Sequence, residues 1–160
     1  MTTLEIFEKI NLIAPVEQRR FFNWLEDSIS ELKLILGNKI YYSGYERLLS
    51  APDDWNEKYN EYFELSSNGF VPVRSNDFKE NKCYKETEKE DPLINIPPPK
   101  HLNDDIVVKS LFHICLIDNI LYLAGLGDGY KNEFLRKASL AEREDWNASN
   151  KGGRIRRMRW

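Results

Sequence analysis

The sequence of 160 residues contains few of the side chains on which catalysis, metal binding and membrane insertion depend. Its two histidines and two cysteines form no pair at the spacing of a metal site or redox motif. No stretch approaches the roughly 20 apolar residues of a membrane span. The N-terminal residues lack the cationic and apolar pattern of a signal peptide. We therefore expect intracellular synthesis, free thiols at Cys83 and Cys115, no metal or other cofactor, and no membrane partner.

The same residues show no arrangement for catalysis. His113 lies beside an apolar helical stripe, where we interpret it as a hydrogen-bonded structural residue. The acidic pairs at 53–54 and 104–105 could serve as acid and base, but each lies where helix capping explains it. The glycines at 125–129 follow a predicted helix rather than a strand, which is typical of a turn and not of a phosphate loop. We therefore expect that the protein is not an enzyme.

Charge is present in abundance but is unevenly distributed. The formal net charge is −3, with 23 basic and 26 acidic residues. The last ten residues hold five basic and no acidic side chains, which leaves a net charge of −8 on residues 1–150. A cationic segment on an acidic body can fold back on its own protein, bind an acidic neighbour or contact nucleic acid.

Apolar periodicity predicts most of the chain to be helical. Thr2 and Glu5 have the spacing of a capping box for a helix at 3–13. Apolar residues at helical spacing predict a second helix from Pro15 to Gly37 and a third from Pro52 to about residue 65. From Asn103 to Asn147 the pattern predicts two antiparallel helices, the first apolar and the second more charged.

Strand signals are short. The β-branched and aromatic run at 39–43 predicts a strand, residues 45–50 a single helical turn, and residues 70–73 an edge strand. Residues 75–100 are crowded with charges and end in three prolines, so we expect a long extended loop there.

We therefore predict a mainly α fold: a helical bundle with a C-terminal helical hairpin, a few short β-strands and a long extended loop. One domain would cover residues 1–150, including the loop at 75–100. Residues 151–160 would form a flexible basic tail.

The C-terminal tail is the feature with the clearest functional signal. Its final residues follow Gly152 and Gly153 and combine four arginines with apolar side chains: Arg154, Ile155, Arg156, Arg157, Met158, Arg159 and Trp160. As an extended strand it could pair with the sheet edge of a partner while its arginines meet carboxylates. A solvated, disordered terminus is the alternative. Nucleic-acid binding fits the charge, although the acidic body opposes it, and one short segment would bind a membrane surface weakly.

The order of elements resembles the head-to-tail connector, adaptor or neck, proteins of tailed bacteriophages. The resemblance rests on the ending LGNKIYYS of the second helix, the central aromatic and strand-like segments, and above all the stretch from Pro97 to Trp146. That stretch reads PPPKHLNDDIVVKSLFHICLIDNILYLAGLGDGYKNEFLRKASLAEREDW. In that family a proline-flanked entry leads into an apolar helix and then a charged one. The charged segment around 75–96 departs from the pattern.

The resemblance implies a structural protein of the virion neck, assembled in the cytoplasm of the bacterial host. It implies a homo-oligomeric ring, commonly of twelve subunits, that binds the portal protein and downstream tail or neck proteins while DNA passes through its lumen without sequence-specific binding. Portal docking would fall to Arg154–Trp160. Contacts of the extended loop would fall to four residues, Leu93, Ile94, Ile96 and Pro97. The alternative is a small helical nucleic-acid-binding or regulatory module that uses the C-terminal segment as a basic arm.

Overall fold

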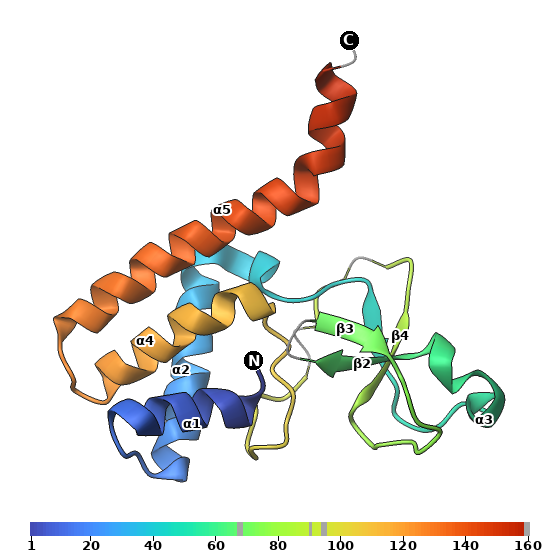
Figure 1. The fold of residues 1–160 in the computed structure, drawn as a ribbon, viewed down its shortest axis with the longest axis horizontal. Helices are drawn as coiled ribbons and strands as arrows, with labels where there is room; N and C mark the ends of the chain where they lie inside the picture. Colours follow the sequence, from blue (N-terminus) through green and yellow to red (C-terminus); the bar gives the residue numbers. More distant parts are fainter. Residues whose placement is uncertain (67–68, 90, 94–95, 159–160) are drawn as a thin grey trace.

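The computed structural model describes residues 1–66, 69–89, 91–93 and 96–158, with side chains described through residue 148 outside those gaps. Four helices lie together on one side of the molecule: α1 (Thr3–Ile13), α2 (Gln18–Leu36), α4 (His113–Leu123) and α5 (Asp128–Met158) (Figure 1). The other side holds a small sheet and the short helix α3 (Trp55–Lys58). We call these two parts the helical body and the sheet lobe.

The N-terminal helices form as their sequence pattern predicts. The Thr2 hydroxyl accepts a hydrogen bond from the Glu5 amide, and the Glu5 carboxylate accepts one from the Thr2 amide, which confirms the capping box and the helix at 3–13. α2 ends at Gly37, whose φ of 74° is a conformation that favours glycine. The second predicted helix is therefore confirmed, although it begins at Gln18 rather than at Pro15.

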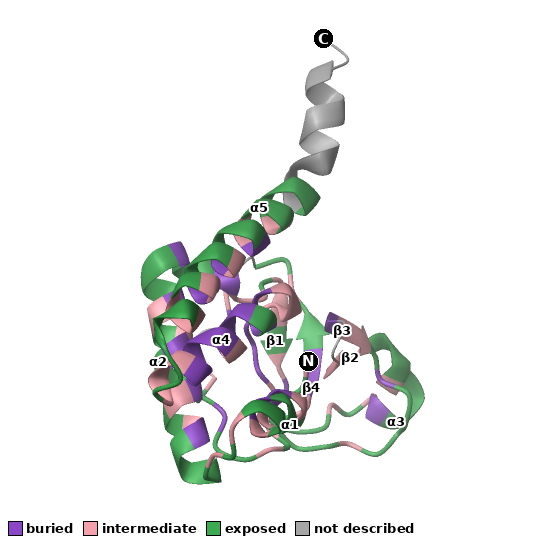
Figure 2. Cartoon of the chain, turned by 60° about the vertical axis from the view of Figure 1, so that its left-hand side comes forward, coloured by how far each residue is buried: buried purple, intermediate pink, exposed green. Residues whose placement is uncertain are grey.

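The helical body is built around α4. Seven of its eleven residues are buried, it packs against α1, α2 and α5, and much of it is coloured as buried in Figure 2. Its neighbours contribute one aliphatic and aromatic stripe each, and the result is a single continuous core. The fully buried members with the largest side chains include Phe21, Phe112, Phe134, Leu116 and Ile120.

The sheet lobe contains four antiparallel strands in the order β1-β4-β2-β3. They are β1 (Tyr45–Arg47), β2 (Phe63–Ser66), β3 (Gly69–Pro72) and β4 (Cys83–Glu86). β2 and β3 form a hairpin in which Phe63 is opposite Pro72, and β4 lies between β2 and β1 with Tyr84 opposite both Phe63 and Arg47. Short 3₁₀ turns, Gly37–Ile40, Tyr59–Glu61 and Ser110–Phe112, join the helices and strands.

Two small clusters hold the sheet lobe. One surrounds Trp55, whose ring lies 5.1 Å from that of Phe78 and 5.6 Å from that of Tyr62. The other surrounds Tyr84, which meets the Phe70 ring edge-on at 5.0 Å. Aromatic rings therefore fill the space that aliphatic side chains fill in the helical body.

The predicted fold class is wrong. The structure is 53% helix and 13% strand, and its strands form one four-stranded antiparallel sheet, so helices and sheet are mixed rather than arranged as a helical bundle. The predicted C-terminal hairpin is not supported either. Its first helix does not begin near Asn103: residues 101–109 are turns and extended chain, and α4 begins only at His113. Tyr41 forms an isolated bridge to Val108, which ties this stretch to the chain after α2.

Local predictions in the middle of the chain are also corrected. Residues 45–47 form strand β1 instead of a helical turn, and the third helix stops after one turn because residues 63–66 join the sheet. The loop at 75–100 contains β4, one of the two inner strands of the sheet. The run at 39–43 forms no extended strand, only single bridges at Tyr41 and Ser43. The predicted strand at 70–73 is confirmed as β3 at the sheet edge.

The acidic pairs do not cap helices through their side chains. Asp54 precedes α3 without a side-chain capping bond and instead accepts a hydrogen bond of 2.9 Å from the Tyr62 hydroxyl. Asp104 accepts from the Lys100 and His101 amides within a turn, nine residues before α4. Both carboxylates stabilise loops, which sequence spacing alone does not distinguish from helix starts.

Candidate functional site

The predicted portal-docking segment, Arg154–Trp160, lies outside the residues whose side chains are described. α5 is assigned as helix through Met158, so Gly152 and Gly153 lie within its span. The docking role and the flexible tail at 151–160 therefore stay predictions.

The predicted contact residues of the loop fall in different environments. Leu93 is buried in a cluster with Tyr84 and Val107, and Ile96 packs partly against the same cluster. Pro97 is exposed, and Ile94 lies outside the described residues. Leu93 therefore contributes to the protein's own core, and of the described members of this group Ile96 and Pro97 retain surface for a partner.

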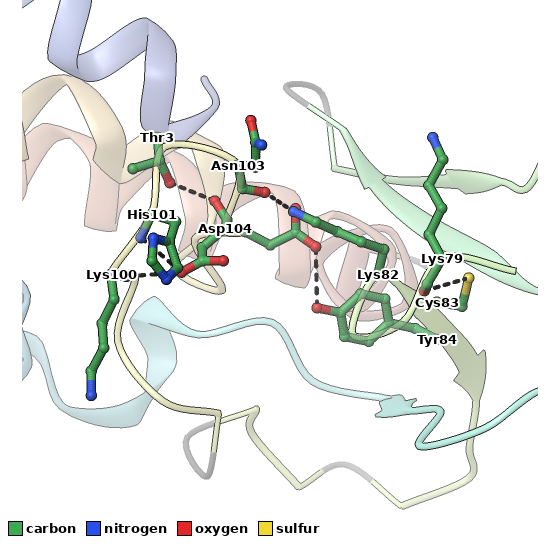
Figure 3. A network of polar contacts seen from close by, with 10 residues as sticks. Thr3, Lys79, Lys82, Cys83, Tyr84, Lys100, His101, Asn103 and Asp104 are labelled. Carbon is green, nitrogen blue, oxygen red and sulfur yellow. Dashed lines mark hydrogen bonds and ion pairs between the residues drawn. The ribbon is translucent and has the colours of Figure 1, made fainter.

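A polar network joins the sheet lobe to the helical body. The Lys82 amine, at the start of β4, donates a hydrogen bond to the Asn103 carbonyl and forms an ion pair of 3.1 Å with the Asp105 carboxylate. The Tyr84 hydroxyl reaches the other oxygen of Asp105 at 3.4 Å. Figure 3 shows Lys82 and Tyr84 pointing from the strand toward the segment that carries Asn103 and Asp104. We call Lys82, Tyr84 and Asp105 the interlobe clasp.

Burial controls the electrostatics of this clasp. It raises the pKa of the Asp105 carboxyl, and the positive charge of Lys82 opposes that rise. Burial also raises the pKa of the Tyr84 phenol well above its usual value, and the neighbouring Asp105 adds to the effect. Both oxygens of Asp105 are occupied by donors from the same chain. The arrangement therefore positions two lobes rather than presenting a carboxylate to a substrate.

A cavity of about 440 Å³ opens beside the clasp, between the start of α1, strand β2 and the segment 101–106. Its walls carry both signs of charge, including the Met1 amine and Lys79 against Glu64 and Asp104. The nearby Thr3 hydroxyl donates to the Asp104 carbonyl at 2.6 Å and ties the start of α1 to this segment (Figure 3). Among the residues that the structure describes, no group of three His, Cys, Asp or Glu side chains is placed to hold a metal.

His113 is buried at the start of α4, between two partners. Its Nε2 lies 2.8 Å from the Val108 carbonyl, to which it donates, so Nδ1 accepts from the Met1 amine at 3.1 Å. Burial, aided by the adjacent N-terminal charge, lowers the pKa of His113 to about 4. The prediction of a hydrogen-bonded structural histidine is confirmed.

Other reactive or ionisable groups are buried in the sheet lobe or paired within the helical body. Cys83 and Cys115 are free and buried, and burial raises the pKa of the Cys115 thiol to about 12, which keeps it protonated. Asp118 is paired with Lys137 at 2.8 Å, and Asn119 donates to the Ser28 hydroxyl at 3.0 Å. Sequence periodicity identifies none of these cross-helix pairs, since each joins residues 19 or more positions apart.

The surface of the helical body carries exposed aliphatic side chains. Leu12 at the end of α1 and Leu34 near the end of α2 are each 87% exposed. Ile35 and Leu135 are also exposed, and they lie in the part of α2 and α5 bracketed by two cross-helix ion pairs, Lys131 with Glu31 and Lys39 with Glu142.

Comparisons with protein-family models, with curated proteins and with solved structures found no match. Among the described residues, no helix combines the length and apolar character that crossing a membrane requires. The candidate sites are thus defined by the geometry of this chain alone.

Proposed function

We propose that the chain is a structural subunit of the bacteriophage neck, a head-to-tail connector that assembles into a ring between portal and tail. The observation that carries the proposal is the presence of exposed aliphatic side chains on two different helices of the body, Leu12 and Ile13 at the end of α1 and Leu34 and Ile35 near the end of α2. Two different surfaces on one subunit can meet head-to-tail, and such contacts close into rings when the rotation permits. The resemblance of residues 97–146 to connector proteins supplies the assignment to the phage neck.

Charge supports the same proposal. A body with a net charge of −8 suits a channel through which DNA passes without being held, because carboxylates repel phosphates. The segment Arg154–Trp160 would dock on the portal, and residues near Ile96 and Pro97 would meet downstream tail or neck proteins. The ring would hold twelve copies, as in the family that the sequence resembles.

The test is assembly of the purified chain, alone and with a phage portal protein. We expect light scattering and electron microscopy to show a ring-sized assembly, alone or with portal. Deletion of residues 152–160 should abolish portal binding and leave the circular dichroism spectrum of the body unchanged. A strictly monomeric chain with no affinity for portal would contradict the proposal.

The basic C-terminal segment favours a second candidate, a nucleic-acid-binding module with a cationic arm. Its five basic residues would release counterions on binding phosphates, so affinity should fall steeply with salt. A DNA titration from about 50 to 200 mM salt separates the two functions. Absence of binding, or a flat response to salt, removes this candidate.

A further inference from the structure

The chain passes between the helical body and the sheet lobe at two segments that pair with each other. Residues 40–42 enter the lobe, and residues 107–109 return from it. The Lys109 amide donates to the Ile40 carbonyl at 2.8 Å, and an antiparallel bridge and a second backbone bond continue the pairing. We call these two paired segments the crossing ribbon. Because both crossings run together, the ribbon provides an axis about which one part can turn relative to the other.

Apolar contact between the two parts gathers beside this ribbon. Val107 packs in one cluster with Tyr84 of β4 and with Leu93, and Tyr41 and Tyr42 pack against the same cluster. Among the described residues, the helices otherwise pack mainly on one another and the strands on one another. The ribbon side of the junction is therefore apolar and well packed, as the axis of a rotation must be.

The interlobe clasp supplies the charged contacts of the junction. Lys82 and Tyr84 reach from β4 to the Asp105 carboxylate (Figure 3). The segment that they hold is tied to the helical body, because the Thr3 hydroxyl of α1 donates to the Asp104 carbonyl at 2.6 Å. Release of Asp105 by β4 would therefore free the lobe from a segment that stays attached to α1.

The cavity of about 440 Å³ lies at the same junction and is lined from both parts. Leu4 and His113 of the body line it together with Glu64 and Leu65 of β2 and with Lys79. The two parts are thus not close-packed across this region, in contrast to protein interiors. A rotation that widens the cavity would separate surfaces that are already apart.

One charge pair holds the clasp in a partly desolvated position. The Lys82 amine and the Asp105 carboxylate lie 3.1 Å apart, and their side chains are 30% and 17% exposed. A charge that is withdrawn from water needs its partner, because the partner offsets the lost hydration. Removal of the Lys82 charge should therefore favour an open junction, in which water solvates Asp105.

We propose that the sheet lobe is a hinged unit that turns on the crossing ribbon, and that the Lys82–Asp105 pair is the latch that holds it closed against the helical body. Opening of the latch widens the cavity between the parts and leaves each part folded. The inference goes beyond the connector function, because it concerns the motion of a single subunit. Ring assembly and portal binding do not enter its test.

Distances between spin labels on the full chain test the hinge. Labels at Leu12→Cys on the body and Leu49→Cys on the lobe report the relative position of the two parts, and these sites are 87% and 83% exposed. The labelled chain is diluted with an excess of unlabelled chain, so that each distance lies within one subunit. A reference pair, Leu12→Cys with Leu34→Cys, lies within the body. The native Cys83 and Cys115 are buried and do not take the label.

A Lys82→Met variant removes the charge of the latch. We expect its body-to-lobe distances to gain a second population, displaced from the wild-type peak by more than the width of that peak. The reference distance within the body should not change. Lys85→Met is the matched control, because Lys85 lies on the same strand and pairs with Glu46 inside the lobe at 3.4 Å. This control should keep the single wild-type distance.

A charge-rescue variant separates the latch from a loss of packing. Lys82→Met/Asp105→Asn leaves no unpaired charge at the latch, and the new amide oxygen can still accept from the Tyr84 hydroxyl. We expect the second population to fall by about tenfold relative to Lys82→Met.

Four outcomes would overturn the proposal. They are a single wild-type distance in Lys82→Met, an equal second population in Lys85→Met, a double variant as open as Lys82→Met, and a changed reference distance in Lys82→Met. In the last case the two parts would lose structure together instead of turning as units. None of these outcomes bears on portal binding, which is tested separately.

Discussion

The helical body and the sheet lobe solve the same packing problem with different side chains. The body buries one continuous core, in which aliphatic residues of α1, α2 and α4 meet Phe134 and two alanines of α5. The lobe divides its buried residues between two clusters, in which tyrosine, phenylalanine and tryptophan rings take most of the contacts. Short strands supply few buried positions each, so large rings fill a space that four helices fill with leucine and isoleucine.

The two parts also differ in how polar groups contribute. Within the body, buried polar side chains meet across helices, as Asn119 meets Ser28. Between body and lobe, the interlobe clasp and a set of backbone bonds do the joining, including the Tyr42 amide to the Val107 carbonyl at 3.2 Å. The body should therefore be sensitive to lost volume, and the boundary should be sensitive to lost hydrogen bonds.

The largest expected effect is a cavity in the helical body. Leu116 is fully buried at the centre of α4, and Leu116→Ala should lower the free energy of unfolding by about 2 to 5 kcal/mol. Urea denaturation followed by circular dichroism measures the change. Leu135→Ala on the exposed side of α5 is the control and should change it by less than about 0.5 kcal/mol. Similar losses in the two variants would mean that the body is not organised around α4.

The next effect depends on pH. The folded pKa of His113 is about 4, below its unfolded value near 6.5, so the unfolded chain binds the proton more readily. The stability that His113 contributes is present above pH 6.5 and is lost as pH falls toward 4, by about 3 kcal/mol at most. His113→Gln keeps a side-chain donor for the Val108 carbonyl and does not titrate. Its unfolding free energy should fall less between pH 7 and pH 4 than that of the wild type, and parallel profiles would contradict the assignment.

A smaller loss is expected at the boundary between the two parts. Asp105→Ala leaves the Lys82 amine and the Tyr84 hydroxyl without their shared acceptor, which should lower the free energy of unfolding by about 1 to 3 kcal/mol. Hydrogen exchange should accelerate at the amides of β4 more than at those of α4. Asp91→Ala removes an exposed carboxylate from the same lobe and should leave both rates unchanged. Equal acceleration of exchange in α4 and β4 would show that the clasp stabilises both parts equally, contrary to this prediction.

The comparison also explains which elements the sequence could predict. α1 and α2 follow from local signals, a capping box and a terminal glycine beside a 3.6-residue apolar period. Strands β1, β2 and β4 do not, because each is three or four residues long and mixes charged residues with aromatic ones. β4 reads CYKE within a run of charges, and its place between β1 and β2 depends on pairings with residues 19 or more positions away. Tertiary context overrides local propensity most strongly in such segments.

The candidate sites show the same division. His113 could be interpreted as a structural residue from its position beside an apolar stripe, and its hydrogen bonds agree with that interpretation. The interlobe clasp could not be predicted, because Asp105 meets residues of β4 only after the sheet has formed.

The smallest predicted difference lies along α5, between two of the ion pairs that join this helix to the rest of the body. Lys109 and Asp145 meet at 3.0 Å with side chains only 21% and 16% exposed, whereas Lys39 and Glu142 are 51% and 38% exposed. Asp145→Asn should lower the free energy of unfolding by about 1 to 2 kcal/mol, because it weakens a largely desolvated charged hydrogen bond. Glu142→Gln should lower it by less than about 1 kcal/mol, and added salt should reduce that loss further. Urea denaturation of both variants at 0.1 and 1 M salt measures the two effects. A larger loss of unfolding free energy for Glu142→Gln than for Asp145→Asn would contradict the prediction.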